Sequence, residues 1–111
     1  MNRSRADALQ GALDLLVLKI LSRRPGLHGY AIMSAIQAAS GEVLRAEEGS
    51  LYPALHRCEK AGFIEPEWKT TGNGRRARVY RLTKEGRKRL KQIERSWATL
   101  SEGVQRVLRW T

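Results

Sequence analysis

The pattern of apolar and polar residues changes its period once in the middle of this chain. Leu51, Leu55 and Cys58 recur at the spacing i, i+4, i+7, which predicts a helix with one buried face. Gly62 follows where a left-handed residue would end that helix. The opposite face of the predicted helix is polar and aromatic, and it carries Tyr52, His56, Arg57 and Lys60.

A period of two takes over after this helix. Alternating residues over 64–69 and again over 79–82 predict two strands. The segment 71–77 between them contains Asn-Gly, which supplies the positive φ that a hairpin turn needs, and it carries the pair Arg75 and Arg76. A polar-faced helix followed at once by a basic hairpin is typical of a winged helix-turn-helix that binds DNA.

Two further helices are predicted ahead of this unit. The first begins at a capping box formed by Asp7 and Gln10 and ends before Pro25. Its buried face consists of Leu9, Leu13, Leu16 and Ile20. The second runs over about residues 28–39 and stops at Ser40. Its apolar side consists of Tyr30, Ile32, Met33 and Ile36. The predicted fold class is therefore mainly α with a small β-hairpin.

The last segment carries a narrow apolar stripe of the kind that packs against a partner helix. Its members follow an uninterrupted 3-4-3-4-3 spacing, and they are Leu90, Ile93, Trp97, Leu100, Val104 and Val107. Thr83 is the predicted N-cap, and Gly86 stands where a capping box would need Glu or Gln, which predicts a loose start.

Part of this stripe is expected to pack on the first helix of its own chain. Burying all six side chains at roughly 1.5 to 3 kcal/mol each offsets an association cost of about 4 to 15 kcal/mol, so a homodimer is predicted. Residues 1–82 are expected to form the DNA-binding domain and residues 83–111 a long C-terminal dimerisation helix.

Charge is concentrated rather than spread. Residues 69–91 hold ten basic residues and one acidic residue, so they carry 10 − 1 = +9 of the chain's net +10. This local excess favours a phosphate-binding surface over a merely solvated face, because a solvated surface usually mixes both signs.

Length and cysteine content narrow the class of protein further. A chain of 111 residues has room for one small domain, and the single Cys58 excludes an internal disulfide framework. Asp7, Asp14 and Lys19 interrupt the only stretch that resembles a signal peptide, and no segment is long enough to cross a membrane. We therefore expect a soluble, cytoplasmic protein with no membrane partner.

Enzymatic chemistry is not predicted. Two histidines and one cysteine show no zinc spacing, and the sequence contains no Gly-rich phosphate loop and no nucleophile motif. We expect no catalytic residue, no metal site and no cofactor. His28 is expected to be a packing residue, His56 a residue of the DNA face and Cys58 a buried thiol.

Several segments together resemble the PadR-type transcriptional regulators, and in particular the short subgroup with a single C-terminal helix. The resemblance covers nearly the whole chain through LDLLVLKIL, HGY, GSLYPALHR and GRRARVYRLT, of which GSLYPALHR at 49–57 is the specific part. It implies a dimeric winged-helix protein, usually a repressor, that binds a palindromic operator and is often released by a small effector. The family's DNA-contacting helix maps to Ser50, Tyr52, Pro53, His56 and Arg57, and its wing to Asn73, Gly74, Arg75 and Arg76.

The chemistry of these residues allows alternatives. Ser50 and Pro53 suit a helix start that attracts phosphate, or simple helix initiation. Tyr52 suits a DNA contact or packing under the wing. Arg57 suits a guanine edge, a phosphate or solvent, whereas a hairpin tip with two arginines suits a minor groove and its phosphates.

Two questions stay open at the level of sequence. Trp97 either fills a helix interface as core or offers a flat wall to a small planar hydrophobic effector, as in some members of the similar family. The chain as a whole is either a sequence-specific, effector-responsive repressor or a non-enzymatic winged-helix module. Such a module would clamp structured RNA or DNA without sequence specificity, or act as a protein-interaction scaffold. RNA is disfavoured because its narrow major groove hides the base edges from a protruding helix.

Overall fold

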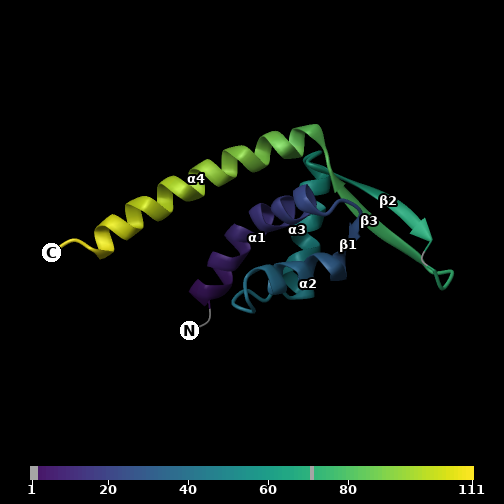
Figure 1. Cartoon of the computed structure of the whole chain (residues 1–111), viewed down its shortest axis with the longest axis horizontal. Helices are drawn as coiled ribbons and strands as arrows, with labels where there is room; N and C mark the ends of the chain where they lie inside the picture. Colours follow the sequence, from purple (N-terminus) through teal and green to yellow (C-terminus); the bar gives the residue numbers. More distant parts are fainter. Residues whose placement is uncertain (1–2, 71) are drawn as a thin grey trace.

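The computed structural model contains four helices and a small antiparallel sheet (Figure 1). It describes the backbone of residues 3–70 and 72–111 and the side chains of residues 12–70 and 72–111. The elements, in chain order, are α1 (Arg3–Arg23), β1 (Leu27–His28), α2 (Gly29–Ala39), α3 (Glu48–Lys60), β2 (Ile64–Thr70), β3 (Arg76–Leu82) and α4 (Lys84–Leu108). The capping contacts predicted for Asp7 and Gln10, the burial of Leu9 and the turn position of Thr71 lie outside the described residues.

α1 lies at the centre of the fold and contacts α2, α3, α4 and β3. It begins at Arg3, four residues before the predicted start at Asp7. Leu13 is fully buried as predicted, but Leu16 and Ile20 are only partly buried. The deepest positions of α1 are instead Val17, Leu18 and Leu21. The predicted face is therefore part of the buried surface but not all of it, because a helix surrounded by neighbours buries more than one side.

α2 has the predicted extent, and its first residues are arranged differently from the prediction. His28 is exposed and caps the helix, since its Nδ1 accepts a hydrogen bond from the Ala31 N–H at 3.2 Å. The predicted packing role of His28 is therefore wrong. Ile32 and Ile36 are buried, whereas Tyr30 is 65% exposed and does not belong to the apolar side.

The sheet has three strands in the order β1-β3-β2, one more than the predicted hairpin. β1 pairs with β3 through Leu27 opposite Tyr80 and His28 opposite Val79. The two long strands pair from Ile64 opposite Leu82 to Thr70 opposite Arg76. β1 is too short to show any alternation, so the pattern of the sequence gave no indication of it.

α3 begins earlier than expected. Its N-cap is Glu47, which makes no side-chain capping bond, so Ser50 lies inside the first turn rather than at the cap. Pro53 lies within the helix, beyond the first turn, and denies the carbonyl of Gly49 its usual N–H partner. The end is as predicted, because Gly62 has φ +81° and the N–H of Phe63 bonds to the carbonyl of Cys58 at 2.9 Å.

The start of α4 is tightly held, which corrects the expectation of a loose one. Thr83 Oγ1 accepts a hydrogen bond from the Gly86 N–H at 3.0 Å and donates one to the Gly62 carbonyl at 2.6 Å. A side chain at Gly86 would overlap the carbonyl oxygen of Phe63 and come within 2.7 Å of Leu82 Cδ1. Glycine at this position therefore lets the helix approach the backbone closely.

α4 then leaves the body of the molecule. Its early residue Leu90 is buried and Ile93 packs against the core, while Leu100, Val104 and Val107 are 58%, 47% and 71% exposed. Figure 1 shows the second half of the helix projecting away from the other elements, and the molecule measures 61 × 31 × 22 Å. Half of the apolar stripe therefore has no partner within the described chain.

Candidate nucleic-acid interface

The exposed face of α3 has its centre on three residues that follow helical spacing. Pro53, His56 and Lys60 stand at i, i+3 and i+7, and all three are exposed. The opposite face fixes the helix in the core through Leu51, Ala54, Leu55 and Cys58, each no more than 1% exposed. The sequence thus folds into a helix that presents one polar stripe outward from a rigid support.

Tyr52 lies at one edge of this stripe and is partly packed. It is 47% exposed, and its ring lies against Gly29, where an added Cβ would come within 3.0 Å of Cε1. The glycine of the HGY motif therefore makes room for the Tyr52 ring of α3. The hydroxyl end of the ring takes part in this packing, because the Tyr52 oxygen would lie 3.2 Å from the added Cβ.

Arg57 and Ser50 lie on the other edge. Ser50 is half-buried in the first turn of α3. Arg57 Nη2 lies 3.0 Å from Asp14 Oδ1 of α1, and both side chains are partly exposed. A DNA contact by Arg57 stays a prediction, and the guanidinium would make it with the N–H donors that Asp14 does not engage or by leaving this carboxylate.

The wing tip gathers the predicted hairpin residues on one surface. Gly74 has φ +80° and supplies the positive φ of the turn, and the Arg75 N–H bonds to Asn73 Oδ1 at 3.4 Å. Asn73, Arg75 and Arg76 line a shallow hollow of about 590 Å³ together with His28, Gly72 and Ala77.

The base of the wing is tied to α3. Arg78 Nη2 donates to both oxygens of Glu59, at 3.0 and 2.9 Å, and its guanidinium lies 5.9 Å from the ring centre of Tyr80. This bridge joins the base of the wing to α3, the helix that carries the other residues predicted to contact DNA.

Trp68 is a residue of this surface that the sequence analysis missed. It was interpreted as one of the alternating strand residues, but it is 57% exposed. The guanidinium of Arg76 lies over its ring, 5.0 Å from the centroid. An exposed tryptophan among arginines in a predicted wing is itself unusual, and that composition was the available indication.

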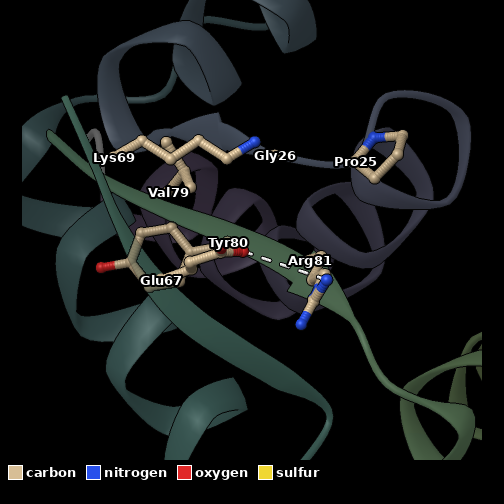
Figure 2. Close-up of a pocket in the computed structure, with 7 residues that line it drawn as sticks. All are labelled: Pro25, Gly26, Glu67, Lys69, Val79, Tyr80 and Arg81. Carbon is tan, nitrogen blue, oxygen red and sulfur yellow. Dashed lines mark ion pairs between the residues drawn. The ribbon is translucent and has the colours of Figure 1, made fainter. Parts of the chain in front are cut away.

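A smaller pocket of about 240 Å³ lies on the other face of the sheet (Figure 2). Val79 forms part of its lining, Lys69 extends over it toward Gly26, and Arg81 pairs with Glu67 at 3.9 Å. None of the predicted DNA-contacting residues lines it. Val79 and Tyr80 both line it and are both buried, although neighbouring residues of a strand point to opposite faces.

Cys58 is a buried thiol, as expected. It is 1% exposed, and burial raises its pKa to about 12, with the charge of Asp14 acting in the same direction and that of Arg57 against it. The thiol is therefore protonated and unreactive at neutral pH. Among the side chains that the structure describes, no cluster of three His, Cys, Asp or Glu residues could hold a metal ion.

The match to known proteins covers most of the chain. Residues 17–92 match the family model of the transcriptional regulator PadR-like family. This chain belongs to the PadR-like family. The family consists of transcriptional regulators, so the predictions of a DNA-binding regulator and of a non-enzymatic protein are confirmed.

Solved structures and a curated relative agree with this assignment. A PadR family transcriptional regulator from Eggerthella lenta is 33% identical, with a TM-score of 0.80 over 98% of this chain and 93% of its own. A PadR-like transcriptional regulator from Bacillus cereus is 28% identical, with a TM-score of 0.79 over 95% of this chain and 99% of its own. A transcriptional regulator of Mycobacterium tuberculosis is 38% identical over 61% of this chain and 63% of its own. The predicted winged-helix fold is thereby confirmed.

The residues predicted for a dimer interface fall into two groups along α4. Leu90 is 6% exposed within its own chain, so it has almost no surface left to offer a second chain. Ile93 packs partly on the same core, and Trp97 is half-buried. The last three members are exposed.

No helix in the described part of the chain is both long and apolar enough to span a bilayer.

Proposed function

We propose that this PadR-like regulator is a homodimeric repressor that binds a palindromic operator and is released by a small planar hydrophobic effector. The observation that carries the proposal is the stripe of Leu100, Val104 and Val107, which is exposed on a helix that projects from the fold. Apolar residues at this spacing stabilise a helix when a second helix covers them.

A symmetric dimer gives a reason for a palindromic site. Two copies related by a two-fold axis present two α3 helices and two wings to DNA, so each half-site meets the same surface. Binding both half-sites at once raises the apparent affinity by roughly 10²- to 10⁴-fold over one half-site.

The first test is a selection of bound sites from random duplexes. A two-fold symmetric consensus supports the proposed repressor. The absence of any consensus, with tight binding retained, favours instead a winged-helix module that clamps nucleic acid without sequence specificity. Transcription from a promoter that carries the selected site then distinguishes repression from activation.

The second test changes the exposed stripe. Val104→Lys should yield monomers in sedimentation and weaken binding to the palindrome by about 100-fold or more, because each chain then binds one half-site alone. Thr99→Lys adds the same charge at an exposed position of α4 outside the stripe and should leave the dimer intact. An intact Val104→Lys dimer would place the interface elsewhere.

The effector is proposed to stack on Trp97. This indole is half-buried, at the point where the packed part of α4 gives way to the exposed part. Planar aromatic cations or phenolics should quench tryptophan fluorescence and change DNA affinity, since a ligand that prefers one helix spacing shifts the distance between the recognition helices. Trp97→Ala should abolish this binding while the dimer survives. Dissociation of that variant, with no quenching in the parent, would show that Trp97 is only structural.

A further inference from the structure

The arginines around the recognition helix and the wing are held in two different ways. Arg57, Arg78 and Arg81 each lie within 3.2 Å of a carboxylate oxygen. Arg76 lies over the ring of Trp68 instead, 5.0 Å from its centroid. No ion pair joins Arg76 to a carboxylate in the part of the chain that the structure describes.

The two arrangements have opposite consequences for an incoming phosphate. A carboxylate takes up part of the five N–H donors of a guanidinium and offsets its charge, so the attraction left for a phosphate is weaker. An aromatic face attracts the flat side of the cation and leaves the donors at its edge unoccupied. Arg76 therefore keeps both its charge and its donors for DNA, although its position is restrained.

The strand register explains how Trp68 reaches Arg76. Trp68 pairs directly with Arg78, and Arg76 is the diagonal neighbour on the same face of the hairpin. Arg78 is itself fixed by its two hydrogen bonds to Glu59 of α3. Trp68 therefore lies between Arg78, which is bonded to α3, and Arg76, which is nearer the wing tip.

We propose that Trp68 is a positioning residue for DNA binding, whose ring holds the Arg76 guanidinium extended to meet a phosphate of the DNA backbone. This role accounts for a large indole that is 57% exposed and so contributes little to the core. The inference deepens the proposed function and rests on DNA binding by the wing.

The test is a double-mutant cycle on a mixed-sequence duplex, with affinity measured over a range of salt concentrations. Arg76→Ala should lower the log–log salt slope by about 0.9, because one phosphate contact is lost. Trp68→Leu should weaken binding about two- to fivefold, and Trp68→Phe should retain most of the affinity because it keeps an aromatic face. In the Arg76→Ala background, Trp68→Leu should have no further effect. Trp110→Leu, at an indole 85% exposed beyond the end of α4, is the matched control.

Each other outcome has a definite meaning. An equal loss from Trp68→Leu with and without Arg76 would show that the ring contacts DNA by itself, and the positioning role would be overturned. No loss in either background would overturn it as well. If Trp68→Leu fails to fold, an Arg76→Ala variant with the affinity and salt slope of the wild type would decide against the proposal, because Arg76 would then meet no phosphate. Wild-type protein without salt-dependent duplex binding would contradict the proposed function rather than this inference.

Discussion

The two halves of α4 share one apolar spacing and have opposite surroundings. In the first half, Leu90 is buried against the fold and Gly86 touches the backbone of Phe63. In the second half, Val104 and Val107 continue the same stripe in solvent. One helix therefore serves as a core element at its start and as an open surface at its end.

This difference shows what a heptad pattern can and cannot reveal. The spacing establishes that a face will be covered, but it is silent on whether the cover comes from the same chain. Geometry decides, because Lys19 of α1 pairs with Glu94 of α4 at 3.2 Å, whereas the second half of α4 projects away from the other elements.

The largest difference between the two halves of α4 is expected from substitutions of their glycines. Gly86→Ala should destabilise the fold by roughly 3 kcal/mol or more, because the new methyl group overlaps a backbone carbonyl that cannot move cheaply. Gly103→Ala makes the same change in the exposed half, where nothing lies within 4 Å, and should stabilise the helix by about 0.5–1 kcal/mol. Thermal unfolding of both variants measures the contrast. Shifts of the same sign would contradict the close contact of the first half.

Leucine substitutions in the two halves of α4 are expected to differ in stability by a smaller amount. Leu90→Ala should cost about 2–3 kcal/mol of unfolding free energy at any protein concentration, because it leaves a cavity in the core of one chain. Leu108 is 72% exposed, so Leu108→Ala should cost less than about 0.5 kcal/mol in dilute protein. Chemical denaturation at several concentrations separates the two cases. A cost at Leu108 that grows with protein concentration would locate it in a subunit interface.

Much of the fold was predictable because its elements carry strong local patterns. The face of α3, the hairpin and the long final helix each follow a clear period, and Gly62 and Gly74 take the positive φ that their positions require. These features depend on neighbours in sequence, and so a single sequence reveals them.

The errors arose where distant parts of the chain decide the outcome. The apolar run of α1 satisfies several helical faces, and only the surrounding elements select Val17, Leu18 and Leu21 for the deepest positions. β1 exists because β3 offers an edge to pair with, and its two residues show no period. The tight start of α4 depends on Phe63, more than twenty residues earlier in the chain.

The candidate site was predictable in composition but not in arrangement. Sequence pointed to a polar helix face and to two arginines at the hairpin tip. It could not show that Arg57 forms an ion pair with Asp14 and Arg78 one with Glu59, because these pairs join different elements. Nor could it reveal that Trp68 holds Arg76, since that contact depends on strand register.

The hydroxyl of Thr83 links the end of α3 to the start of α4 through two hydrogen bonds. It donates to the Gly62 carbonyl and accepts from the Gly86 N–H, while the Thr83 N–H bonds to the Phe63 carbonyl at 3.0 Å. The two helices therefore meet through one hydrogen-bonded residue, so a tilt of α4 at its start would act directly on the end of α3.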